Sequence, residues 1–136
     1  MAGERQDLNA RIAGMPFATG LGLREVWGDL EGIDAVADWA AEHCTGGDTL
    51  HGGYLMTVAD TLGAMCAGLH LPAGAGTTTI ESKTNFMAGV RAGTIRVRSE
   101  PVHVGRTTIV VQTDIRRDDG KLVSRTTQTQ AVLQPR

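Results

Sequence analysis

The sequence places a lone carboxylate shortly after a pair of glycines. His51-Gly52-Gly53 directly precedes a largely apolar run, and Asp60 lies inside that run. At the start of a helix the first backbone N–H groups have no intrahelical partner, and glycine leaves them open to a ligand. A bare N–H of this kind can stabilise negative charge developing on a carbonyl oxygen. Each feature alone has a structural explanation, a helix-entry turn or a hydrogen-bonded Asp, but their combination favours a catalytic site.

The residues around Asp60 predict a buried helix between His51 and His70. One apolar face repeats at three- and four-residue steps: Leu55, Val58, Ala59, Leu62, Met65, Cys66 and Leu69. The opposite side carries small residues: Thr57, Asp60, Thr61 and Ala64. We therefore expect a central helix that is buried on both sides. Asp60 is its only residue charged at neutral pH, and a carboxylate in such a place is costly unless it is paired or functional.

Four runs with period-two patterning and many β-branched residues follow this helix, separated by glycine-containing turns. They are Thr77–Phe86, Thr94–Val104, Thr107–Arg116 and Leu122–Leu133. Several strands beside one buried helix indicate an α+β domain in which an antiparallel sheet wraps around the helix.

The segment before the central helix is predicted to be simpler. Glu4–Met15 has weak helical periodicity that stops at Pro16, so we expect a short N-terminal helix. Leu21–Trp27 and Ile33–Trp39 flank a turn-rich segment and predict a hairpin. Ala40–Leu50 has the composition of a loop.

Length and charge restrict the function. The 136 residues suit a single domain, 1–136, with residues 1–15 before a core of 16–133. A formal net charge of −2 argues against a nucleic-acid partner. No signal peptide or apolar stretch long enough to span a bilayer is apparent, so we expect no membrane partner. Cys44 and Cys66 lack metal-ligand spacing and predict reduced thiols in a cytoplasmic protein, with no metal and no cofactor.

The motif His51-Gly52-Gly53 followed by Val58-Ala59-Asp60-Thr61 resembles the signature of the hotdog thioesterases. It is most similar to the phenylacetate-degradation and Arthrobacter-type hydroxybenzoyl-CoA thioesterases. The segments 84–86, 102–106 and 118–123 also resemble the later strands of this family, so the likeness covers about Pro16 to Leu133 in order.

The resemblance implies a hotdog fold and hydrolysis of an acyl-CoA to the free acid and coenzyme A. Asp60 matches the catalytic carboxylate, which acts as nucleophile or as general base for water, and Gly52 matches the residue whose N–H binds the thioester carbonyl. Gly105, Arg106 and Thr107 fall where relatives contact coenzyme A. Further substrate contacts are expected near the motif, from His51, Gly53, Thr45 and Thr61.

Three positions depart from the family pattern. Relatives usually carry Asn or Gln where this chain has Thr45, some carry Thr or Ser where it has Ala64, and an Arg-Pro pair is common where it has Ala88-Gly89. Thr57 or Thr61 could supply the missing hydroxyl, and Arg91 the missing cation. These departures affect the substrate and the rate more than the reaction class.

Helix geometry predicts that the site is shared between two chains. Gly52 and Asp60 are eight positions apart, about 12 Å along one helix, too far to serve one carbonyl. We therefore expect a homodimer, with a homotetramer as a further possibility. The alternatives to hydrolysis are a non-catalytic acyl-CoA-binding module, a hotdog dehydratase and a dimeric scaffold.

Overall fold

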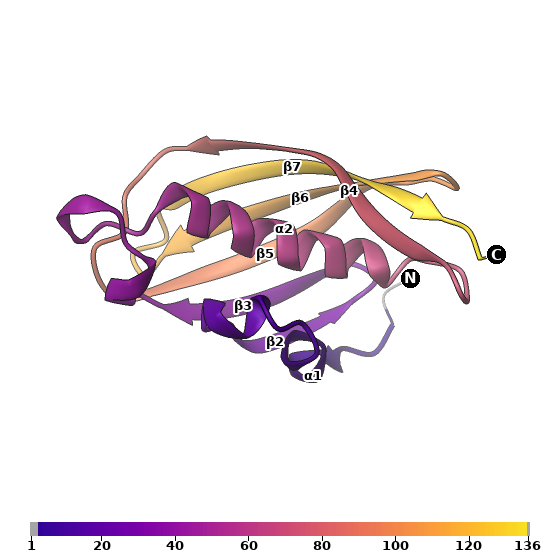
Figure 1. Cartoon of the computed structure of the whole chain (residues 1–136), viewed down its shortest axis with the longest axis horizontal. Coiled ribbons are helices and arrows are strands. Elements are labelled where there is room, and N and C mark those ends of the chain that lie inside the picture. The colour runs from indigo at the N-terminus through magenta and orange to yellow at the C-terminus, as the bar shows by residue number, and fades with distance from the viewer. Residues whose placement is uncertain (1–2, 136) are drawn as a thin grey trace.

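The longest helix, α2 (Gly52–Gly68), lies along one face of a seven-stranded antiparallel sheet (Figure 1). The computed structural model describes residues 3–135. The strands are β1 (Gln6–Asp7), β2 (Arg24–Asp29), β3 (Gly32–Asp38), β4 (Gly76–Phe86), β5 (Thr94–Val104), β6 (Thr108–Arg117) and β7 (Leu122–Leu133). A short helix, α1 (Asn9–Ala13), and three 3₁₀ turns, η1 (Ala18–Leu21), η2 (Ala41–His43) and η3 (Gly46–Asp48), complete the described chain. The predicted α+β hotdog architecture is confirmed.

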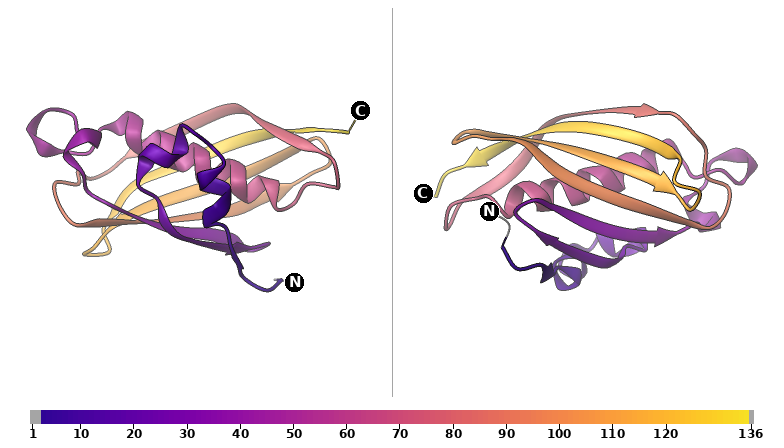
Figure 2. Two further views of the ribbon diagram at one scale, coloured as in Figure 1. Left: turned by 60° about the horizontal axis from the view of Figure 1, so that its bottom comes forward. Right: turned by 180° about the vertical axis from the view of Figure 1, so that it is seen from behind.

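The strands lie in the order β1-β2-β3-β5-β6-β7-β4, and every neighbouring pair is antiparallel. The sheet curves around α2, and the β2–β3 hairpin closes it on the side of the N-terminal segment (Figure 2). β4 is an edge strand, with β7 on one side and no other described strand on the other. Its 11 residues leave a long row of backbone groups open to pairing.

The predicted elements after Gly20 agree closely with the structure. β5 and β7 have the predicted bounds, β4 begins one residue earlier, and β6 is shifted by one residue at both ends. The expected hairpin is β2 and β3, although β2 begins three residues later and ends two residues later than the predicted 21–27. The loop over Ala40–Leu50 contains the turns η2 and η3. Among residues 3–135, no helix is long and apolar enough to cross a bilayer.

The predicted N-terminal helix over Glu4–Met15 is wrong in its first half. Gln6–Asp7 pairs with β2 as a short strand, and only Asn9–Ala13 is helical. The Asp7 carboxylate accepts the Asn9 backbone N–H at 2.9 Å, a local turn that starts the helix later than periodicity suggested.

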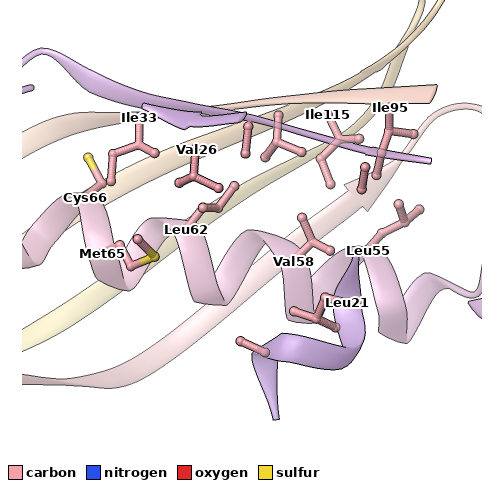
Figure 3. Close-up of a cluster of buried hydrophobic side chains, with 14 of the residues drawn as sticks. Leu21, Val26, Ile33, Leu55, Val58, Leu62, Met65, Cys66, Ile95 and Ile115 are labelled. Atoms are coloured by element: carbon pink, nitrogen blue, oxygen red, sulfur yellow. The ribbon is translucent and has the colours of Figure 1, made fainter. Parts of the chain in front are cut away.

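The core lies between α2 and the sheet. Leu62, Val58 and Cys66 of the helix are fully buried and face side chains such as Ile33, Ile95 and Ile115 (Figure 3). The expectation that α2 is buried on both sides is wrong for the single chain. Thr57, Asp60, Thr61 and Ala64 on its small-residue side are only half-buried, because none of the described residues covers that face fully.

Candidate active site

The N-terminus of α2 presents one unengaged backbone donor beside an aromatic ring. His51 is extended, and its Nδ1 accepts the Gly53 N–H at 2.7 Å, which caps the helix. Within residues 3–135 the Gly52 N–H makes no hydrogen bond. A Cβ added at Gly52 would lie 3.2 Å from Cζ of Phe86, so the backbone and the ring approach closely. The helix therefore begins with a free N–H at Gly52, next to a pocket of about 370 Å³ that Leu55 and Phe86 also line.

Asp60 lies two turns further along α2, half-buried, and its carboxylate is held by two neutral donors. Its Oδ1 accepts the hydroxyl of Thr79 at 2.7 Å and the Nε2 of Gln128 at 3.0 Å. The residue lines a surface pocket of about 320 Å³ together with Phe17, Met56, Thr57, Thr61, Thr79 and Ser82. Asp60 thus combines an ordered carboxylate with access to an open pocket, as a catalytic acid or base requires.

Among the described residues, neither Thr57 nor Thr61 bonds the Asp60 carboxylate. Thr57 donates to the Gly53 carbonyl at 2.8 Å, as threonines inside helices often do. Thr61 lines the Asp60 pocket, but Thr79 of β4 is the residue that bonds the carboxylate. Sequence reasoning missed both Thr79 and Gln128.

A second pocket, of about 520 Å³, adjoins the start of the helix. His51, Gly53, Tyr54 and Thr57 line it from α2 and its cap, and Phe17 lines both this pocket and that of Asp60. The N-terminal segment forms its opposite wall. The two pockets therefore meet at Phe17 and Thr57, between the helix start and the carboxylate.

The wall of this second pocket is tied to α2 by an aromatic pair. The rings of His43 and Tyr54 stack with centroids 4.2 Å apart, and each side chain bonds a carbonyl of the N-terminal segment, Gly20 and Leu21, respectively. Burial raises the pKa of Tyr54 to about 12, so its hydroxyl stays protonated and donates to Leu21. The pocket wall is therefore fixed to the helix rather than free.

The remaining predicted contacts lie apart from these pockets. Thr45 is exposed, and its backbone N–H bonds the Thr49 carbonyl. The β5–β6 turn consists of Gly105, Arg106 and Thr107. It lies at the end of the sheet where α2 ends, whereas Gly52 begins α2 at the other end (Figure 1). A single chain does not bring this turn to the helix start.

The buried thiol of Cys66 is unsuitable as a nucleophile. Burial raises the pKa of the Cys66 thiol to about 12, which keeps it neutral, and Cys66 lies in the core. Within residues 3–135, no three His, Cys, Asp or Glu side chains are grouped so that they could hold a metal ion.

Comparisons with known proteins identify the family of this chain. The sequence profile described as the thioesterase superfamily matches residues 47–124, more than half of the chain and the whole of the His51–Asp60 region. A candidate esterase of Haemophilus influenzae is 36% identical over 80 residues, which cover 57% of this chain and 58% of that protein. The match thus spans little more than half the length of this relative.

Solved structures extend the likeness to almost the whole fold. A mutant thioesterase from Pseudomonas aeruginosa superposes with a TM-score of 0.86 at 27% identity, covering 94% of each chain. A hypothetical thioesterase of Streptococcus pneumoniae, solved with coenzyme A, gives a TM-score of 0.71 at 25% identity over 78% of this chain and 81% of that one. With the fold, the glycine-led helix and the profile in agreement, this chain belongs to the thioesterase superfamily.

Proposed function

We propose that this chain hydrolyses acyl-CoA thioesters, with Asp60 as the catalytic carboxylate. The observation that carries the proposal is the placement of Asp60: the only charged residue of α2, half-buried, hydrogen-bonded through Oδ1 and open to a pocket. Membership of the thioesterase superfamily supports the reaction class. The coenzyme A in the Streptococcus pneumoniae thioesterase supports the choice of thiol.

In this proposal the Gly52 N–H binds the thioester oxygen, where negative charge grows as the carbonyl carbon is attacked. Asp60 either attacks that carbon, forming an anhydride that water then cleaves, or takes a proton from the attacking water. Both routes break the C–S bond and yield the free acid and coenzyme A.

We propose that the reacting groups come from two chains. Gly52 and Asp60 lie about 12 Å apart along α2, whereas a thioester needs both within about 3 Å of its reacting atoms. A two-fold partner whose helix runs antiparallel can set its Asp60 opposite this Gly52. Two features support such a homodimer: the half-buried Asp60 side of α2 and the open edge of β4.

Coenzyme A contact at the β5–β6 turn is also part of the proposal. Gly105, Arg106 and Thr107 lie far from Gly52 of their own chain, so they would serve the site containing the partner's Gly52. If Arg106 holds a phosphate of the coenzyme, Arg106→Ala should raise KM and leave kcat nearly unchanged. With an acyl-N-acetylcysteamine, which lacks the nucleotide, Arg106→Ala should cause a smaller loss of activity, and equal losses on both substrates would contradict the contact.

Two free cysteines, Cys44 and Cys66, support a reducing, cytoplasmic setting for this chemistry.

The test of the reaction is thiol release from a panel of aryl- and alkyl-CoA thioesters. We expect turnover by the wild type and a loss of roughly 100-fold or more in kcat for Asp60→Asn, which keeps the shape of the side chain but removes its charge. Binding without turnover would instead assign the chain to the non-catalytic acyl-CoA-binding modules.

The shared site is tested by mixing two inactive variants. Asp60→Ala removes the carboxylate. Gly52→Pro removes the N–H at the first helical position, and the extended His51 can precede a proline. Gly52→Ala is the matched control, because it brings a Cβ toward Phe86 but keeps the N–H. Joint refolding of the two inactive variants yields about half heterodimers, each with one intact site, so about a quarter of wild-type activity should return. Heterodimers that form but stay inactive would refute the shared site.

A further inference from the structure

Two strands bring a network of buried and half-buried polar side chains to the Asp60 carboxylate. Thr79 of β4 donates to Oδ1 of Asp60 at 2.7 Å, and Thr79 itself accepts the Nε2 of Gln130 at 2.7 Å. Gln128, two residues before Gln130 on β7, donates to the same Oδ1 at 3.0 Å. Gln128 and Gln130 are both fully buried. These contacts join the edge of the sheet to the middle of α2.

The hydrogen bonds of this network run in one direction, from Gln130 through Thr79 to Asp60. Thr79 has a single hydroxyl proton, and because Gln130 donates to its oxygen, that proton is left for Asp60. If the Gln130 amide were flipped, its oxygen would face the Thr79 oxygen, whose only proton is already donated to Asp60. The Gln130 oxygen instead faces the hydroxyl of Thr77 at 3.1 Å, and that hydroxyl is shared with the Ala131 carbonyl at 3.0 Å. Oδ1 of Asp60 is therefore an acceptor from two donors at once.

Gln128 occupies its position at a cost to packing and to hydrogen bonding. A Cβ added at Gly63 would lie 2.0 Å from Oε1 of Gln128, so the amide fits only because residue 63 has no side chain. That Oε1 is buried and has no hydrogen-bond partner among residues 3–135. A buried acceptor without a partner is unfavourable, and an apolar side chain of similar size would avoid it. The amide nitrogen, which binds Asp60, accounts for its presence.

We propose that Thr79, Gln128 and Gln130 are positioning residues that reserve Oδ1 of Asp60 for hydrogen bonds and leave Oδ2 for the reacting atoms. This inference rests on the proposed function, because it assigns a task to residues around the proposed catalytic group. The network fixes the rotation of the carboxylate and selects which oxygen attacks carbon or takes the proton from water. A preorganised carboxylate needs no reorientation when charge moves in the reaction.

The test replaces the hydroxyl of Thr79 and compares it with a hydroxyl of the same strand. Thr79→Val keeps the shape and removes the donor to Asp60. Thr84→Val is the matched control: Thr84 is also on β4, also half-buried, and bonded at 2.7 Å to another side chain, Thr126. We expect Thr79→Val to lower kcat about tenfold with little change in KM, and Thr84→Val to leave both nearly unchanged. Thr79→Ser, which retains the hydroxyl, should recover most of the rate.

Gln128→Met provides a second variant if Thr79→Val folds poorly, since it keeps the length and loses the amide. We expect a similar fall in kcat. In the Asp60→Asn background, neither Thr79→Val nor Gln128→Met should lower the residual rate further, because both act through Asp60. Thermal unfolding of each variant separates these effects from loss of folded protein.

The outcomes distinguish the inference from the proposed function. If Asp60→Asn abolishes turnover but Thr79→Val and Gln128→Met keep wild-type kcat, the positioning network is refuted and the reaction stands. Equal losses in Thr79→Val and Thr84→Val, or additive losses in the Asp60→Asn background, also refute it. If wild type and Asp60→Asn release thiol equally, the proposed function itself fails.

Discussion

The sheet offers α2 two different inner surfaces. On β5 and β6 the buried side chains are mostly aliphatic: Ile95, Val97, Ile109, Val111 and Ile115. The two polar exceptions, Ser99 and Thr113, are hydrogen-bonded to each other at 2.6 Å. On β7, at the neighbouring position in the same sheet, the buried series at alternating residues is polar, and it is Ser124, Thr126, Gln128 and Gln130. Both surfaces are buried, so they differ in the contacts that they offer α2: aliphatic packing on β5 and β6, and polar groups on β7. We call them the apolar half and the polar half of the sheet.

The helix faces match these two halves. Val58, Leu62 and Cys66 pack into the apolar core, whereas Asp60 bonds Gln128 of the polar half. Gly63 also faces that half, where it makes room for the Gln128 amide. Stability should therefore depend mainly on the apolar half and chemistry on the polar half, and each prediction below tests that division.

Leu62→Ala should give the largest change in stability. Leu62 is fully buried in the core, and removing its side chain leaves a cavity that costs about 3 kcal/mol of the free energy of unfolding. Denaturant unfolding measures the loss. Activity per folded molecule should remain near that of the wild type, and a specific fall in kcat at full folding would break the proposed division.

Gly63→Ala should affect both properties. The added methyl group would overlap Oε1 of Gln128, and relieving that overlap should cost about 1–3 kcal/mol of stability. Because the displaced amide is also a donor to Asp60, kcat should fall as well. Gly68→Ala is the matched control on the same helix, since a Cβ there would meet nothing within 4 Å. Unchanged kcat in folded Gly63→Ala would separate Gln128 from the chemistry.

The apolar half was predictable from the sequence, and the polar half was not. Alternation of aliphatic and polar residues over 94–98 indicates that Ile95 and Val97 face the core, and β5 has the predicted bounds. In Leu122–Leu133 both alternating series are largely polar, so the pattern predicts a strand but not its buried face. Asp60 stood out as a lone charge in a helix, whereas Thr79 and Gln128 gave no such signal. Their role depends on which strands are neighbours, and β4 pairs with the last strand rather than the next one.

Ser124→Ala should change the free energy of unfolding less than Leu62→Ala or Gly63→Ala does, and in the opposite direction. Ser124 belongs to the polar half, but within residues 3–135 its hydroxyl is buried without a hydrogen-bond partner. Removing an unsatisfied buried hydroxyl should raise the free energy of unfolding by about 1 kcal/mol and leave kcat unchanged. A decrease in stability would mean that the hydroxyl is paired in solution.

The smallest effect is expected at the hairpin that joins the two halves, between β6 and β7. The Arg117 guanidinium, with help from the Lys121 backbone N–H, lowers the pKa of Asp119 from its ordinary 3.8 to about 2. A carboxyl group with a lowered pKa in the folded state stabilises the protein above its unfolded pKa, and this contribution is lost as pH falls from about 4 through about 2. Asp119→Asn should therefore lower the melting temperature slightly near neutral pH, and the gap from the wild type should close by about pH 2. The side chain is exposed, so salt should shrink the gap as well. A gap that persists at pH 2 would show that Asp119 stabilises the turn through its shape rather than its charge. The β6–β7 hairpin would then stabilise the fold through its packing and turn geometry, as the apolar half does, and not through the charge of Asp119.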